Sequence, residues 1–172
     1  GWGNGRNCHI RPYWVHIPDA HVFKGVEDML YLIRDIRQNS KDFSENPLIY
    51  VDKDKAEEMY YKKQTEQLIL DAMEKDRIEV YYQPIYSTKE RCFTSAEALV
   101  RIRDEAGEIV PPGIFIDVAE QNGMILRLGE MVFEKVCRFV KEHDIKRYGL
   151  HYIEINLSVV QCSYEQLAED YI

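Results

Sequence analysis

The chain has 172 residues, of which 45% are hydrophobic and 30% are charged, so it has enough apolar side chains for a core. Its formal net charge of -8 argues against a general nucleic-acid surface or an anionic-membrane surface, because both prefer basic patches. The sequence shows no signal-peptide pattern and no stretch of 18 apolar residues, so we expect no membrane segment. Composition therefore predicts a cytoplasmic, globular protein, and the start at Gly1 predicts an internal fragment of a longer one.

Residues 1–54 are expected to form a first segment with the order strand, helix, strand. A β-rich run extends from Cys8 to Ile17 and is closed by a Pro-Asp pair. A following amphipathic helix of about four turns is predicted from the helical spacing of apolar residues at Val26, Met29, Leu30, Ile33 and Ile36. A polar stretch and a short strand at residues 48–51 complete this segment.

Residues 55–76 are expected to form one helix that separates two domains. Its predicted buried stripe consists of Tyr61, Thr65, Leu68, Ile69 and Ala72. Such a helix can be the linker of a two-domain signalling protein or an ordinary packing helix, and the spacing does not distinguish these alternatives.

Residues 77–172 are expected to form a second domain in which strands alternate with helices. We predict strands at 78–86, 93–102 and 150–157, a short helix at 113–121, a longer helix through Glu142 and a final helix from Tyr164. The longer helix should bury Leu128, Val132, Val136, Phe139 and Val140. This order predicts βα units and a parallel sheet or barrel.

The strand at 93–102 has one apolar face and one charged face. Side chains alternate along a strand, so Glu97, Leu99 and Arg101 share a face, opposite the small apolar residues Ala96, Ala98 and Val100. An unpaired buried charge is costly, so the charged face needs water, a metal or a ligand, unless Glu97 and Arg101 form an ordinary ion pair.

The strand at 150–157 repeats this pattern, with a polar face that consists of Tyr152, Glu154 and Asn156. At the mouth of a barrel, Glu97 and Asn156 would be able to present oxygen atoms to one divalent cation such as Mg²⁺ or Mn²⁺. A salt bridge is the expected role for Glu154, and a strand-end turn is the ordinary alternative for Asn156.

The cysteines and histidines show no metal-ligand spacing. No CxxC pattern joins Cys8, Cys92, Cys137 and Cys162, so reduced and buried cysteines are predicted rather than a disulfide or a zinc site. The five histidines are scattered along the chain and are expected at the surface or at helix ends.

Residues 97–101, Glu-Ala-Leu-Val-Arg, resemble the founding motif of the EAL family, the cyclic diguanylate phosphodiesterases of bacterial signalling. Four further stretches resemble family landmarks in the same order, at residues 81–85, 112–116, 119–125 and 155–158. The resemblance covers residues 77–172. It implies an α/β fold, an incomplete (β/α)8 TIM-type barrel, because such barrels need roughly 250 residues.

The resemblance also implies roles for individual residues. Glu97 and Asn156 match metal ligands for Mg²⁺ or Mn²⁺, Arg101 matches a phosphate-binding position, and Gln83 matches a residue near the bound cyclic diguanylate. The family's remaining metal ligands would lie beyond Ile172, so the chain alone is expected to be inactive. A homodimer through the EAL domain is a further implication.

Residues 1–54 loosely resemble the C-terminal end of a GGDEF domain, a small α+β domain that often precedes an EAL domain. Met29, Leu30 and Tyr31 lie where that family has Ala-Leu-Tyr.

The alternatives to a phosphodiesterase are a non-catalytic cyclic diguanylate receptor or interaction scaffold, and an unrelated barrel enzyme.

Overall fold

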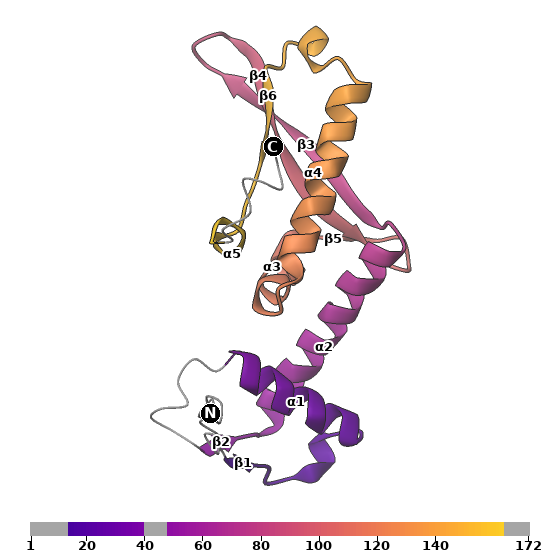
Figure 1. Ribbon diagram of the computed structural model, residues 1–172, viewed down its shortest axis with the longest axis vertical. Helices are drawn as coiled ribbons and strands as arrows, with labels where there is room; N and C mark the ends of the chain where they lie inside the picture. The colour runs from indigo at the N-terminus through magenta and orange to yellow at the C-terminus, as the bar shows by residue number, and fades with distance from the viewer. Residues whose placement is uncertain (1–13, 40–47, 164–172) are drawn as a thin grey trace, which may run out of the picture. The chain divides into compact units, whose positions relative to one another are not determined.

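The computed structural model of the protein describes residues 14–39 and 48–163. The chain divides into two compact units, residues 1–63 (unit 1) and residues 64–172 (unit 2). Helix α2 (Lys53–Glu74) begins in unit 1 and ends in unit 2 (Figure 1). The boundaries predicted after residues 54 and 76 stay predictions. Most of the β-rich run from Cys8, and the whole helix predicted from Tyr164, lie outside the described residues.

Unit 1 has the predicted order of strand, helix and strand. Strand β1 (Trp14–His16) is followed by the 3-10 helix η1 (Ala20–Val22), helix α1 (Val26–Asn39) and strand β2 (Leu48–Tyr50). β1 and β2 pair in parallel. A parallel pair needs a crossover connection, and α1 lies in that connection.

The buried face of α1 differs from the predicted one. Three residues of the predicted stripe are exposed: Val26, Leu30 and Ile33. The helix buries Ile36, as predicted, but it also buries Tyr31 and Leu32, and these three residues pack with Val51 of the following segment and Met59 of α2. The prediction was partly wrong because it did not include the carboxylate of Asp28, which lies on the buried face with Tyr31 and Leu32.

Asp28 is buried because three donors in unit 1 satisfy its carboxylate. Tyr60 Oη donates to Oδ2 at 2.6 Å, Lys63 Nζ lies 2.8 Å from Oδ1, and the backbone N–H of Lys24 donates to Oδ2 at 3.1 Å. The hydrogen bond from Lys63, followed by that from Tyr60, lowers the pKa of Asp28 to about 2. This polar cluster joins α1 to the first part of α2.

Unit 2 contains the remaining elements. They are β3 (Ile78–Ser87), β4 (Cys92–Arg103), β5 (Ile109–Val110), α3 (Pro112–Gln121), α4 (Met124–Glu142), the 3-10 helix η2 (Ile145–Tyr148), β6 (Tyr152–Ile155) and α5 (Val159–Cys162). The three strands and two helices predicted before Tyr164 are confirmed, with shifted ends. The short helix α5 was not predicted.

The sheet of unit 2 is mixed rather than wholly parallel. β3 and β4 form an antiparallel hairpin, and β5 also pairs antiparallel with β4. The expected βα unit is absent here because residues 88–91 are too few for a parallel crossover. β4 and β6 are parallel, as predicted, and α3 and α4 lie in the chain between them.

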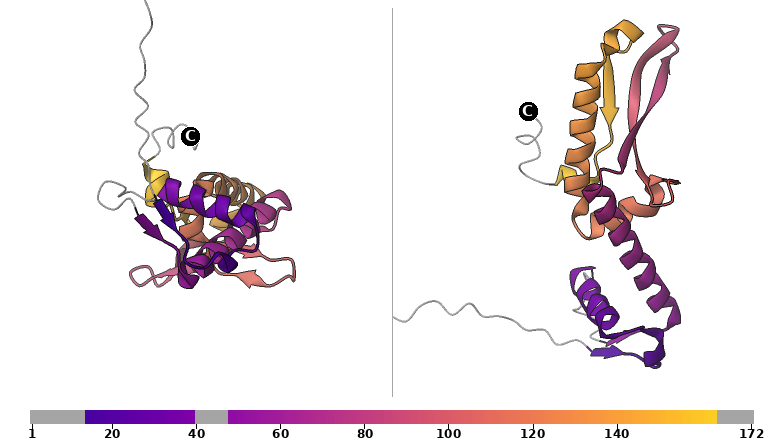
Figure 2. Two further views of the ribbon diagram at one scale, coloured as in Figure 1. Left: turned by 90° about the horizontal axis from the view of Figure 1, so that it is seen from below. Right: turned by 90° about the vertical axis from the view of Figure 1, so that its right-hand side faces the viewer.

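One face of this sheet packs into the core of unit 2. On β4, Ala96, Ala98 and Ile102 are almost fully buried. Ala98 and Ile102 belong to a cluster with Phe115 of α3 and Leu128 of α4. Figures 1 and 2 show α4 running alongside β6 and the hairpin. The helices therefore cover the small, apolar face of β4, which leaves Glu97 and Arg101 on the opposite face.

Some side-chain predictions are wrong in detail. Tyr61 of α2 and Val140 of α4 are exposed, although the other members of both predicted stripes are buried or half-buried. The described cysteines, Cys92, Cys137 and Cys162, are free as expected but exposed rather than buried. Within residues 14–39 and 48–163, no helix has the length and apolar character needed to cross a membrane.

Candidate ligand site

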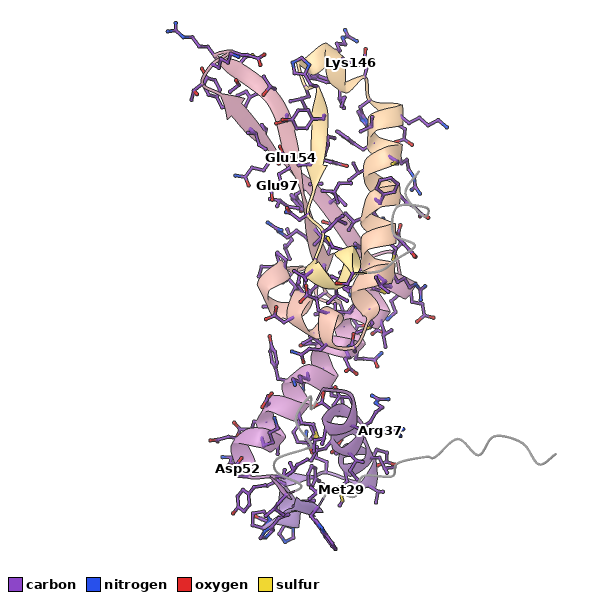
Figure 3. All side chains as sticks on the ribbon, turned by 60° about the vertical axis from the view of Figure 1, so that its left-hand side comes forward. Met29, Arg37, Asp52, Glu97, Lys146 and Glu154 are labelled. Atoms are coloured by element: carbon purple, nitrogen blue, oxygen red, sulfur yellow. The ribbon has the colours of Figure 1, made fainter. Side chains whose placement is uncertain are left out.

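Three polar side chains form a row across the face of the unit 2 sheet that lies opposite α3 and α4. Gln83 of β3 is the cross-strand partner of Glu97, and Glu154 of β6 is the partner of Glu97 on the other side. Residues in register project from the same face, so the three lie side by side. Figure 3 shows Glu97 and Glu154 next to each other on neighbouring strands. Gln83 and Glu154 are exposed, and Glu97 is half-buried.

Asn156 follows β6 directly and contacts Glu97. Its amide Nδ2 donates a hydrogen bond to Oε1 of Glu97 at 2.5 Å. The parallel pairing of β4 and β6 brings these residues together although they are 59 positions apart. Glu154 has no ion-pair partner among the described residues, so the expected salt bridge is not found.

Arg101 is half-buried and does not pair with Glu97. Its Nη1 donates to the carbonyl oxygen of Val100 at 2.8 Å, and within the described ranges it has no carboxylate partner. The ordinary ion pair considered for Glu97 and Arg101 is therefore absent from the structure. A guanidinium carries five N–H donors, so Arg101 retains donors that can accommodate an anion.

A second glutamate and arginine on the same face are paired with each other. Arg103 Nε lies 2.6 Å from Oε1 of Glu79, and Arg103 Nη2 lies 2.9 Å from Oε2. The hydrogen bond from Arg103 lowers the pKa of Glu79. Tyr81 Oη adds a further donor at 3.2 Å. The face therefore contains an arginine that is paired with a carboxylate, Arg103, and an arginine without a carboxylate partner among the described residues, Arg101.

A pocket of about 290 Å³ lies at the carboxyl ends of the parallel strands β4 and β6. Its polar lining includes Arg101, Glu120, Asn156, Ser158 and Gln161. Apolar residues of α3 and α4, among them Ile116 and Ile125, complete the wall. The pocket thus brings together Arg101 and Asn156 of the predicted site residues. Glu97 lies beside it through its hydrogen bond to Asn156, and Gln83 lies across the sheet from Glu97.

The oxygen atoms at this site are of the type that a hard divalent cation prefers, but the described residues supply too few of them. Glu97 offers carboxylate oxygens, and Asn156 offers Oδ1 when its amide is turned, two groups that Mg²⁺ and Mn²⁺ accept. No group of three or more His, Cys, Asp or Glu side chains able to hold a metal occurs in the described part of the chain. Glu97 and Asn156 would therefore be two ligands of a site that needs others.

Ser158 and Gln161 were not among the predicted site residues. They form a capping box at the start of α5, in which Ser158 Oγ accepts from the backbone N–H of Gln161, and Gln161 Oε1 accepts from that of Ser158. The spacing Ser-x-x-Gln is a sequence signature of a helix start, so this signal was present in the sequence. The capping box fixes the start of α5, whose N-cap Ser158 lies two residues after Asn156.

Residues 66–172 match the family model described as EAL domain. The match covers more than half of the chain, which therefore belongs to the EAL family. It includes the sheet, the helices α3 and α4, and the pocket.

Curated relatives agree with this family. The chain is 38% identical over 96 residues to the signaling protein YkoW of Bacillus subtilis, which is 56% of this chain and 12% of that protein. It is 37% identical over 75 residues to the cyclic di-GMP phosphodiesterase NbdA of Pseudomonas aeruginosa, which is 44% of this chain and 10% of the relative. The chain thus spans only a small part of the length of these relatives.

Solved structures resemble the chain in the same region. A structure of the PaMucR phosphodiesterase in complex with c-di-GMP has a TM-score of 0.57 and 27% sequence identity, and the match covers 63% of this chain and 44% of that one. The FimX EAL domain from Pseudomonas aeruginosa bound to c-di-GMP has a TM-score of 0.52 and 20% identity, with coverage of 61% and 41%. The second likeness shows the fold alone.

Proposed function

We propose that this chain is part of an EAL-domain protein that binds cyclic diguanylate (c-di-GMP) and hydrolyses it in a metal-dependent reaction. The observation that carries the proposal is Arg101, a half-buried guanidinium without a carboxylate partner in the described residues, in a pocket at the carboxyl ends of parallel strands. Such a group favours an anion, and a phosphate of a cyclic dinucleotide provides one. The family membership and the phosphodiesterase relatives support this ligand.

In this proposal, the predicted residues have separate roles. Arg101 binds a phosphate group, and Gln83 lies near the bound dinucleotide. Glu97 and Asn156 hold one divalent cation, Mg²⁺ or Mn²⁺, which would supply positive charge to the phosphate and to a bound water. Their hydrogen bond supports this assignment because it places two potential oxygen ligands next to each other.

We further propose that the fold is an incomplete TIM-type barrel and that residues 1–54 are the C-terminal remnant of a degenerate GGDEF domain. The parallel pairing of β4 and β6 supports the barrel, and the strand, helix and strand order of unit 1 supports the remnant. The chain covers 44% of the solved PaMucR phosphodiesterase chain, so the remaining metal ligands would come from residues outside these 172. The 172-residue chain alone would then be inactive. We also propose that the complete protein is cytoplasmic and that its EAL domain forms a homodimer.

A non-catalytic receptor is the second candidate. The same pocket and Arg101 would bind the dinucleotide without hydrolysing it if the remaining metal ligands were replaced. The two candidates agree on binding and differ only in turnover by a complete protein.

Isothermal titration of c-di-GMP into the 172-residue chain tests the shared part of both candidates. We expect binding to this chain, with no linear product on chromatography in the presence of Mg²⁺ or Mn²⁺. Absence of binding would contradict the ligand proposal, and formation of linear product above the buffer rate would contradict the incomplete metal site.

A further inference from the structure

Gln161 has a buried side-chain donor that none of the described residues satisfies. The residue is 2% exposed, and its Nε2 has no hydrogen-bond partner among the described residues. A buried donor without an acceptor costs free energy, so native proteins rarely retain one without a partner that arrives from elsewhere.

The orientation of this amide follows from its surroundings. The backbone N–H of Ser158 needs an acceptor, and Gln161 Oε1 provides it at 3.0 Å. Turning the amide by half a revolution would set Nε2 against that N–H, with donor facing donor. Nε2 is therefore the group that remains for another partner.

The capping role alone does not require glutamine. In a capping box, glutamate at this position accepts the same backbone N–H through a carboxylate oxygen. Glutamine differs from glutamate in offering an N–H donor in addition to the oxygen. The extra donor belongs to a side chain that lines the same pocket as Arg101 and Asn156.

We propose that Gln161 is a ligand-binding residue, whose Nε2 donates a hydrogen bond to a phosphate oxygen of the bound cyclic dinucleotide. The inference rests on the proposed function, since it takes the same ligand in the same pocket. Arg101 and Gln161 then bind the ligand from different sides, one from β4 and the other from α5. In this proposal the capping box also fixes the position of the donor Nε2 of Gln161.

Gln161→Glu is the sharpest test, because it keeps the capping oxygen and removes the donor. Isothermal titration of c-di-GMP into the 172-residue chain should show an affinity about 10- to 100-fold lower than that of the unchanged chain. Val159→Glu is the matched control for the added charge. Val159 is 81% exposed on the same short helix and does not line the pocket. It should leave the affinity nearly unchanged.

Two more variants separate binding from capping. Ser158→Ala removes the hydroxyl that caps the helix but leaves the side-chain donor of Gln161 in place, so it should lower the melting temperature and weaken binding less than Gln161→Met does. Gln161→Met removes both functions without adding charge and should lower both. The side-chain NH₂ signals of Gln161 in the NMR spectrum of the unchanged chain give a readout that needs no variant, and they should shift on addition of c-di-GMP.

The outcomes distinguish the two proposals. If the unchanged chain binds c-di-GMP but Gln161→Glu binds equally well and the NH₂ signals do not shift, the role of Gln161 is wrong and the proposed function stands. If Val159→Glu weakens binding as much as Gln161→Glu, charge explains the effect and the contact is also refuted. If the unchanged chain binds no c-di-GMP, the proposed function fails, and the inference fails with it.

Discussion

Glu79 and Arg103 lie on neighbouring strands of unit 2 and form an ion pair with contacts of 2.6 Å and 2.9 Å. Glu97 and Arg101 project from the same face, but among the described residues they do not pair with each other. Glu97 accepts from the amide of Asn156, and Arg101 donates to a backbone carbonyl at the edge of the pocket. The two sets contain the same residue types but differ in how completely their charges are compensated.

This difference separates charges that serve the fold from charges that are available to a ligand. A carboxylate and a guanidinium that bind each other compensate each other's charge. Few of their donors and acceptors then remain for a third partner. An arginine whose partner is only a carbonyl retains both its charge and its donors. The comparison therefore assigns Glu79 and Arg103 to structure, and Glu97 and Arg101 to binding.

The largest expected effect is on turnover. In a complete protein that carries this EAL domain, Glu97→Gln preserves the shape of the side chain but removes the charge proposed to hold the cation. Initial rates of c-di-GMP hydrolysis should fall by several orders of magnitude, with a much smaller loss of binding. Glu79→Gln in the same protein is the matched control and should retain turnover. Equal rates for both variants would abolish the distinction between the two glutamates.

The next effect concerns Asp28, a paired carboxylate in unit 1. Its pKa is lowered from 3.8 to about 2, so its contacts should stabilise the folded state by roughly 2 kcal/mol above pH 4. That contribution is present above the unfolded pKa and is lost as the pH falls from about 4 to about 2. Urea unfolding followed by the circular dichroism of the helices measures it, because Asp28 lies on α1.

Asp28→Asn is the control for this pH dependence. The variant lacks the titrating group, so its unfolding free energy should be lower at neutral pH and should change less between pH 4 and pH 2. A variant with the same pH profile as the unchanged chain would show that another group is responsible.

The smallest expected effect is that of Glu79→Gln on the stability of the 172-residue chain. The pair with Arg103 is partly exposed to solvent, so its loss should lower the melting temperature only slightly. The pKa of Glu79 is lowered, so this contribution should fade as the pH drops below the ordinary glutamate range. Binding of c-di-GMP should not change. A clear loss of affinity would place Glu79 in the ligand site.

Most elements of unit 2 follow from sequence periodicity. α3, α4 and the alternating faces of β4 and β6 are encoded by apolar residues at regular spacing. The hairpin of β3 and β4 was missed because the sequence was interpreted as strands alternating with helices, although residues 88–91 are too few for a parallel crossover. Part of the buried face of α1 was missed because the burial of Asp28 depends on donors about 35 positions away, which no local pattern contains.

The site was only partly predictable for the same reason. Alternation along one strand indicated that Glu97 and Arg101 share a face, and the family motif supplied their roles. The contact of Glu97 with Asn156 depends on strand pairing over 59 positions. The unused donor of Gln161 depends on burial by several elements, although its capping motif is local. The roles of Gln83, Glu97, Arg101 and Asn156 remain predictions.

Binding of c-di-GMP to Arg101→Ala and Arg103→Ala is the measurement that tests the central claim most directly. The two arginines are two positions apart on β4 and differ in their partners and in their place, since Arg101 lines the pocket and Arg103 does not. Isothermal titration into the 172-residue chain should show roughly 10- to 150-fold weaker binding for Arg101→Ala, the value of a charge-assisted contact to phosphate. Arg103→Ala should bind nearly as well as the unchanged chain. Equal affinities for the two variants, or a larger loss for Arg103→Ala, would contradict the account.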